Sequence, residues 1–355
     1  MTESSSRDAV DGAALAEQAL DGDRRAIARL LTLLEDGHPE GQAALATLFP
    51  HGGRAHIVGF TGSTGSGKST LLNQVAKEFR RRGAELAVVA VDPTSPITGG
   101  ALLGDRLRMR DLAGDPGIFI RSMASRGDPG GVARATRDVV TALDGLGFPL
   151  ILVETVGAGQ AQVEIARIAQ TIVLVEAPGM GDDIQALKAG LMEIADIIVV
   201  NKADRPEAKQ TLRALRRASL QGPSFEPHHA RDGSGVSADA EPSPEAAEAP
   251  EAVPILETSA LEGWGIEALV NAIEAHQAQV RAKEISAASE REEARRKADA
   301  RAGVESWLQQ HLYAWAMQRL EPSRFEAVVE AVARREQDPA SAARELLEAL
   351  IAELR

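Results

Sequence analysis

Residues 56–75 read HIVGFTGSTGSGKSTLLNQV, a short apolar run, a glycine-rich loop and then apolar residues at helical spacing. The loop, residues 62–69, satisfies G-x-x-x-x-G-K-[ST] in the strand–loop–helix context that phosphate binding requires. Small residues let backbone N–H groups turn inward around phosphates, and the helix N-terminus adds partial positive charge. We predict that Lys68 reaches the β- and γ-phosphates of a nucleotide and that the Ser69 hydroxyl ligates Mg²⁺. The predicted phosphate-binding residues are Gly62, Ser63, Thr64, Gly65, Ser66, Gly67, Lys68, Ser69 and Thr70.

Seven short apolar runs have the texture of buried parallel strands, because each is nearly continuous and helical or glycine-rich segments separate them. They are HIVGF (56–60), LAVVAVD (86–92), GIFIRS (117–122), PLILVET (149–155), TIVLVEA (171–177), DIIVVNKAD (196–204) and PILETS (254–259). We therefore predict an α/β fold with a doubly wound, mostly parallel sheet, of the P-loop NTPase class.

Composition narrows the possible functions. The formal net charge is −13, which disfavours broad contact with nucleic acid or with anionic lipid. The chain has no cysteine, so disulfides, thiolate metal sites and cysteine nucleophiles are excluded. The N-terminal residues do not resemble a signal peptide, and no run reaches the roughly 18 apolar residues that a membrane span needs. We expect a soluble cytoplasmic protein that binds neither nucleic acid nor membrane.

The chain divides into three regions. Residues 1–54 carry apolar residues at helical spacing and form a predicted N-terminal helical extension. Residues 55–275 form the nucleotide-binding domain, with a probable disordered insertion at 222–254, which is rich in Pro, Ala, Glu and Ser and poor in large apolar residues. Residues 276–355 are predicted to be helical, including a highly charged stretch that is typical of a solvated helix face.

A second motif indicates which base is bound. Residues 201–204, NKAD, directly follow an apolar strand and match N-K-x-D at the sheet edge where open α/β sheets bind ligands. Guanine presents N1–H and the N2 amino group as adjacent donors, so one carboxylate can accept from both; adenine offers no such pair. We assign that carboxylate to Asp204, with Asn201 and Lys202 holding the loop and the ring. Thr258-Ser259-Ala260-Leu261 resembles a loop that closes over the guanine O6, through Ser259, Ala260 and Leu261. GTP and GDP are thus favoured over ATP.

Acidic strand ends indicate a metal site beside the phosphates. Asp92 and Glu154 each end an apolar strand at the same predicted sheet edge as the phosphate loop, where carboxylates hold Mg²⁺ directly or through water. Asp105 is a third candidate. Glu154-Thr155-Val156-Gly157 takes the place of the D-x-x-G of most GTPases, so Gly157 is expected to offer its N–H to the γ-phosphate.

The sequence leaves open which residue orients the attacking water. Ala158 follows Gly157 and has no functional group, which makes Gln160 the nearest polar candidate for a catalytic role beside Lys68 and Glu154. Hydrolysis is then expected to be slow until a partner completes the site. An arginine finger in cis could come from any of three residues, Arg106, Arg108 and Arg110.

Four longer strings together resemble one family. They are VDPTSPITGGALLGDRLRM (91–109), FIRSMASRG (119–127), VETVGAGQAQVE (153–164) and APGMGDDIQALKAGLMEIADIIVVNKAD (177–204). They are similar to the MeaB/ArgK-type G-protein chaperones of adenosylcobalamin-dependent acyl-CoA mutases, once described as an arginine/ornithine transport kinase. The likeness covers roughly residues 55–270.

The resemblance implies a SIMIBI-type P-loop GTPase that protects its mutase and gates cobalamin delivery and release. On matching positions it assigns Lys68 and Ser69 to phosphate and Mg²⁺, and NKAD to guanine. It assigns the metal and its rearranging shell to Asp92, Asp105 and Glu154. It also implies a homodimer built through C-terminal helices and a mobile loop at 177–188 that carries the message to the mutase.

Departures from the family pattern concern the partner rather than GTP. Ser63-Thr64 replace a pair that more often contains proline, Ala161-Gln162 replace Ser-Glu, and Met180 lies inside the mobile loop. The partner can therefore be methylmalonyl-CoA mutase or an isobutyryl- or hydroxyisobutyryl-CoA mutase.

Aromatic residues gather near the C-terminus of this aromatic-poor chain. Trp307, Tyr313 and Trp315 favour an interface, since large amphipathic rings are common anchors, although packing between terminal helices of one chain would also explain them.

Two rival functions are weaker. A nickel-inserting metallochaperone GTPase would need His/Cys clusters, and the only adjacent histidines are His228-His229 in the predicted insertion. An amino-acid-transport-linked kinase would need an acceptor-binding domain, which is not evident, and NKAD disfavours ATP.

Overall fold

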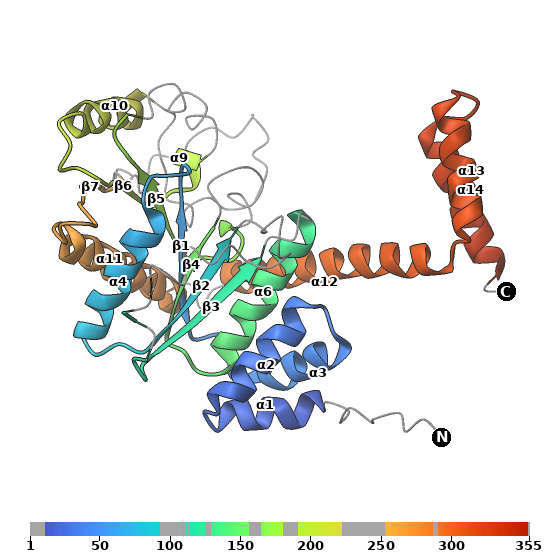
Figure 1. The fold of residues 1–355 in the computed structure, drawn as a ribbon, viewed down its shortest axis with the longest axis horizontal. Coiled ribbons are helices and arrows are strands. Elements are labelled where there is room, and N and C mark those ends of the chain that lie inside the picture. The colour runs from blue at the N-terminus through green and yellow to red at the C-terminus, as the bar shows by residue number, and fades with distance from the viewer. Residues whose placement is uncertain are drawn as a thin grey trace, which may run out of the picture. The chain divides into compact units, whose positions relative to one another are not determined.

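The computed structural model describes residues 11–92, 109, 111–112, 114–124, 129–155, 165–179, 191–221, 253–286 and 290–353. Seven strands of this part form one sheet in the order β3-β2-β4-β1-β5-β6-β7, and every neighbouring pair is parallel (Figure 1). The predicted α/β class with a doubly wound sheet is confirmed, and each predicted apolar run contributes one strand. The strands are β1 (His56–Thr61), β2 (Leu86–Asp92), β3 (Ile118–Ala124), β4 (Leu150–Glu154), β5 (Thr171–Glu176), β6 (Ile197–Val200) and β7 (Ile255–Glu257).

Helices cover both faces of the sheet because successive strand residues point to opposite sides. On one face, Val58, Phe60 and Val88 pack with residues of α4 (Lys68–Arg81) and α11 (Ile266–Ser286). On the other face, Ala87 and Val89 pack with α6 (Pro129–Gly145) and with the N-terminal helices. The double cover explains why the strand sequences are apolar throughout rather than alternating. Figure 1 shows α6 and the N-terminal helices on the same side of the sheet.

The N-terminal helices shield the edge strand β3. They are α1 (Gly12–Leu20), α2 (Arg24–Glu35) and α3 (Pro39–Leu48), followed by the 3-10 turn η1 (Phe49–His51). Glu35 forms an ion pair with Arg121 on β3, and the same carboxylate accepts a hydrogen bond of 3.3 Å from the Ala124 N–H. An exposed sheet edge invites pairing with another chain, and the Glu35 contact occupies one backbone N–H at the end of this edge strand.

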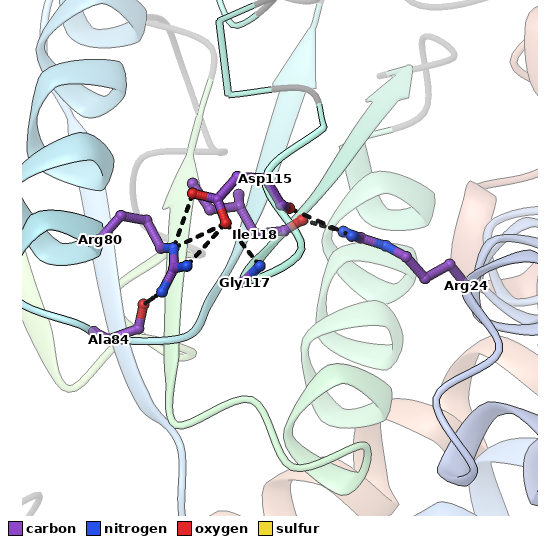
Figure 2. Close-up of polar contacts among 6 residues, drawn as sticks. All are labelled: Arg24, Arg80, Ala84, Asp115, Gly117 and Ile118. Carbon is purple, nitrogen blue, oxygen red and sulfur yellow. Dashed lines mark hydrogen bonds and ion pairs between the residues drawn. The ribbon is translucent and has the colours of Figure 1, made fainter.

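A polar network at the start of β3 joins the phosphate-loop helix to the N-terminal helices (Figure 2). Asp115 accepts hydrogen bonds of 2.9–3.1 Å from the Arg80 guanidinium near the end of α4, and one of 2.8 Å from Gly117 N. These contacts lower the pKa of Asp115 from its ordinary value, with the Arg80 hydrogen bonds as the largest cause. From the other side, Arg24 of α2 donates to the carbonyl groups of Asp115 and Ile118. The turn before β3 is thus held from two directions.

Three further helices lie between or after the strands of the sheet. They are α9 (Leu191–Ile194), α10 (Ala208–Gln221) and the long α11, which follows the last strand. Leu212 and Leu215 of α10 pack with Leu174 and Ile198 of the sheet. Of the predicted insertion 222–254, residues 222–252 lie outside the described residues, whereas Val253 is buried in this cluster and leads into β7.

The chain separates into two compact units, Met1–Ala282 and Lys283–Arg355. The second unit contains α12 (Glu290–Arg319), α13 (Pro322–Ala333) and α14 (Pro339–Glu353). Its small core joins Val328 of α13 to Ala342 and Leu346 of α14. No helix in the described part of the chain is long and apolar enough to cross a membrane.

Candidate phosphate and base site

The phosphate loop joins β1 to α4 with a backbone that two glycines make possible. Gly62 has φ +136°, and an added Cβ would lie 2.1 Å from the carbonyl oxygen of Val175. Gly67, the residue before α4, has φ +91°, and an added Cβ would lie 2.5 Å from Asn201 Nδ2. Only glycine fits positions that combine a left-handed backbone with such close neighbours. Close contact with β5 therefore requires glycine at position 62 of the motif, and close contact with the loop after β6 requires glycine at position 67.

Lys68 lies inside the curve of this loop. Its side chain is buried, and Nζ donates hydrogen bonds of 2.9 Å to the Gly62 carbonyl and 3.0 Å to the Ser63 carbonyl. The ammonium group is at the N-terminus of α4, where the helix dipole is also positive. Two sources of positive charge at one helix end make an anion site without further residues.

Ser69, the residue after Lys68 on α4, contacts Glu154. The Ser69 hydroxyl donates a 2.7 Å hydrogen bond to Glu154 Oε1, at the end of β4. Both residues are buried, and a hydroxyl beside a carboxylate provides the hard oxygen ligands that Mg²⁺ prefers. The backbone of Asp92 ends β2, which pairs with β4 through Ala90 and Glu154, so Asp92 reaches the same sheet edge.

Asn201 connects the phosphate loop to the base-reading loops. Its side-chain Nδ2 donates to the Ser66 carbonyl at 2.9 Å, while its Oδ1 accepts from Thr258 Oγ1 at 3.2 Å and from Ala260 N at 3.1 Å. One amide group therefore holds three segments that are far apart in the sequence. Both its donor and its acceptor are used, so a carboxylate or an aliphatic side chain could not replace it.

The other members of NKAD have separate positions. Lys202 has φ +56° and donates from Nζ to the Gly65 carbonyl at 2.6 Å, which lays its stem across the loop. Asp204 is exposed, and its Oδ1 accepts a 2.7 Å hydrogen bond from Ser259 Oγ. Leu261 is 85% exposed beside them. Lys202, Asp204 and the loop 259–261 thus lie together beside the phosphate loop.

One residue that the sequence motifs did not predict belongs to this site. Glu176 ends β5, is buried, and has Oε2 3.5 Å from Ser63 Oγ. Thr258, the first residue of the predicted base loop, supports Asn201 through the hydrogen bond given above. The signal for Glu176 was available, because it is a strand-end carboxylate next to β1 just as Glu154 is, on the opposite side of β1.

Asp111 and Met109 contact α4 further along the helix than the candidate metal ligands. Asp111 accepts from Asn73 Nδ2 at 3.2 Å and forms an ion pair with Lys77, and these contacts lower its pKa, the Lys77 hydrogen bond being the largest cause. Met109, next to it, is buried against the same helix. Asp111 is therefore held beside α4 at Asn73, one helical turn beyond Ser69, and at Lys77, one turn further.

Several predicted residues lie outside the described residues: Asp105, Gly157, Gln160, the three arginines 106, 108 and 110, and residues 180–188 of the predicted mobile loop. Of that loop, Ala177 and Pro178 are buried and directly follow Glu176.

A parallel sheet with a glycine-rich phosphate loop, a buried lysine and an NKAD loop tied to it define a P-loop GTPase. The chain matches the model of the family described as methylmalonyl-CoA mutase-associated GTPase MeaB over residues 27–316. It belongs to that family, which confirms the resemblance drawn from its motifs.

Individual relatives agree with this assignment. The chain is 55% identical over 204 residues to a Pyrococcus horikoshii protein described as a GTPase, covering 58% of this chain and 64% of that one, just under two thirds of the relative's length. It is 40% identical over 280 residues to a "Probable GTPase" of Mycobacterium tuberculosis, covering 78% and 77%. The crystal structure of an LAO/AO transport system kinase superposes with a TM-score of 0.64 at 24% identity, covering 96% and 97%, and supports the fold.

The role of Asn201 gives a direct prediction. Asn201→Ala removes the hydrogen bonds that join the phosphate loop to residues 258–260, so GDP and GTP should both bind at least roughly 30-fold more weakly, at about 1 kcal/mol for each of two or more lost bonds. Equilibrium titration with a fluorescent guanine nucleotide measures this. Asn271→Ala, on the exposed side of α11, is the control and should bind as the unaltered chain does. Equal affinities in the two variants would contradict the assignment.

Proposed function

We propose that the protein is a GTP-driven chaperone of an adenosylcobalamin-dependent acyl-CoA mutase, which it protects and whose cofactor loading and release it gates. The observation that carries GTP binding is the Asn201 amide, which joins a phosphate loop to a guanine-type loop. Membership of the mutase-associated family supports the partner class. The mutase can be methylmalonyl-CoA mutase or an isobutyryl- or hydroxyisobutyryl-CoA mutase.

The proposed roles follow from position. Lys68 neutralises the β- and γ-phosphates, and the backbone N–H groups of residues 62–70 surround them. Ser69 and Glu154 hold Mg²⁺, with Asp92 and Asp105 in its shell; when bound, Mg²⁺ offsets charge on the phosphate oxygens. Asp204 accepts from guanine N1–H and N2, Lys202 and Leu261 cover the two faces of the ring, and the loop 259–261 lies over O6.

Hydrolysis requires a water that attacks the γ-phosphorus while the bond to the β-phosphate oxygen breaks, which gives GDP and phosphate. Buried Lys68 supplies positive charge beside the leaving group, Glu154 would act there only by holding Mg²⁺, and Gly157 is proposed to bind the γ-phosphate. Gln160 remains our candidate for orienting the water. Because Ala158 offers no functional group there, we propose that turnover is slow until the mutase completes the site.

Base recognition is tested at Asp204. In Asp204→Asn, the amide presents a donor toward guanine N1–H and N2, so affinity should shift from guanine toward xanthine nucleotides, by roughly 100-fold in the ratio. Competition of GTP and XTP against a fluorescent nucleotide gives that ratio. Glu207→Gln, exposed on the surface three residues later, is the matched control. Unchanged GTP preference in Asp204→Asn would refute the base-reading role.

The partner is tested by capture from native lysate. The chain loaded with a non-hydrolysable GTP analogue should retain a cobalamin-dependent acyl-CoA mutase, identified by mass spectrometry, whereas Asp204→Asn under the same conditions should not. Added back, the purified mutase should speed phosphate release by at least about 100-fold, the lower end of what a positioned acid–base group contributes. Recovery of a nickel enzyme, or a captured mutase with no effect on hydrolysis, would count against the proposal.

We also propose a homodimer through the C-terminal helices. On α12, Val304, Leu308 and Leu312 follow one another at four-residue spacing and are 61%, 46% and 59% exposed, with half-exposed Trp307 beside them. An apolar helix stripe of this kind is typical of a helix–helix interface.

The dimer is tested by sedimentation equilibrium. The double variant Leu308→Asp with Leu312→Asp puts two charges into the proposed interface and should raise the dimer dissociation constant by at least about 100-fold, at a few kcal/mol for buried unpaired charges. Glu305→Ala, on an exposed position of the same helix, is the control. A double variant that remains as dimeric as the control would rule out this surface.

A further inference from the structure

At the edge of the sheet opposite the nucleotide site, four polar side chains form a series of contacts; three of them are buried and His276 is partly buried. His56 Nε2, at the start of β1, lies 2.8 Å from Thr171 Oγ1, at the start of β5. The same oxygen lies 2.8 Å from Nδ1 of His276 on α11. His276 Nε2 lies 3.5 Å from Oδ1 of Asp196, whose Oδ2 accepts a 2.8 Å hydrogen bond from Ile172 N.

Burial limits the chemistry that these four side chains can perform. A threonine beside a histidine and an aspartate is the arrangement of a nucleophilic triad, yet Thr171 is 0% exposed, so no substrate can reach its oxygen. In the described part of the chain, no group of three or more His, Cys, Asp or Glu is arranged to hold a metal ion. The roles left for these four side chains are to hold α11 on the sheet and to pass a change of protonation from one side chain to the next.

The direction of its hydrogen bonds follows from the charge of His276. When His276 is neutral, the carboxylate of Asp196 favours the proton on Nε2, so Nδ1 is an acceptor. Thr171 then donates to His276, and its oxygen accepts from a proton on His56 Nε2. When His276 is protonated, both its nitrogens donate. Thr171 then accepts from His276 and turns its own proton toward His56 Nε2, which must carry its proton on Nδ1.

We infer that these four residues form a proton-directed latch, in which the charge of His276 sets the tautomer of His56 through Thr171 and the chain fixes α11 to β1, β5 and β6. The charged and titratable groups around it are Asp196 before β6, His56 on β1, and Arg281 on α11 itself. Burial, together with His276 and Arg281, lowers the pKa of His56 to about 4, so His56 is neutral in both directions of the chain.

The latch lies where α11 also contacts the phosphate-loop helix. Two residues before His276, Glu274 accepts a 2.6 Å hydrogen bond from Arg82, the residue that ends α4. Since α4 begins at Lys68, the helix that carries the phosphate site is linked at its far end to the latched section of α11. Ile273 is fully buried and Val280 nearly so, which places apolar contacts on both sides of His276. The latch therefore fixes the register of α11 on the sheet.

The relay is tested by NMR on the full chain with ¹⁵N-labelled histidine, recorded from pH 5 to 9. His56 is expected to stay neutral while its proton moves from Nδ1 at low pH to Nε2 at high pH, at the pH where the His276 signals show its change of charge. His51→Gln, which removes an exposed histidine, should leave both signals unchanged. A His56 that keeps one tautomer throughout, or a His276 that does not change charge in this range, would overturn the inference.

The hold on α11 is tested with Thr171→Val, which preserves shape and removes the hydroxyl. The His56 signal should no longer respond to His276, and amide hydrogen exchange in residues 273–280 should speed up about tenfold, as expected for one lost buried hydrogen bond. His276→Gln should accelerate the same amides. Unchanged exchange there in both variants would show that the four residues do not latch the helix.

Discussion

The site depends on the side-chain amide of Asn201. It contacts the phosphate loop through Ser66 and the last loop of the sheet through Thr258 and Ala260. These segments come from opposite ends of the nucleotide-binding domain, and the parallel sheet brings them to one edge because all strands point the same way. The close approach of Asn201 to Gly67 shows that the loop glycines serve this junction as well as the phosphates.

Buried charge at that edge gives the site its chemistry. Lys68, Glu154 and Glu176 are each almost completely removed from solvent, where an ionised group is costly unless it is paired or hydrogen-bonded. The lysine binds two loop carbonyls and Glu154 binds Ser69, so each of these two buried charges is hydrogen-bonded. The opposite edge of the sheet uses buried polar groups differently, to fix α11 rather than to receive a ligand.

Much of the fold could be predicted from the sequence because its signals are local. Each strand is a continuous apolar run, and the G-x-x-x-x-G-K-S spacing fixes a strand, a loop and a helix in order. The position of Asn201 beside the phosphate loop could be predicted because the two motifs each follow the carboxyl end of a strand. Glu176 was missed because a glutamate that ends a strand has no spacing signature, and its meaning depends on β5 lying beside β1. The histidine latch was invisible for a similar reason: its contacts join residues 115 and 105 positions apart, which only strand order brings together.

We infer that base binding reaches the phosphate loop through the Asn201 side chain. This is tested by hydrogen exchange of residues 62–69 in the presence of saturating guanosine, which has a base but no phosphate. Guanosine is expected to slow exchange in the phosphate loop of the unaltered chain and not in Asn201→Ala. Protection confined to residues 201–204 and 258–261, with the phosphate loop unaffected, would contradict it.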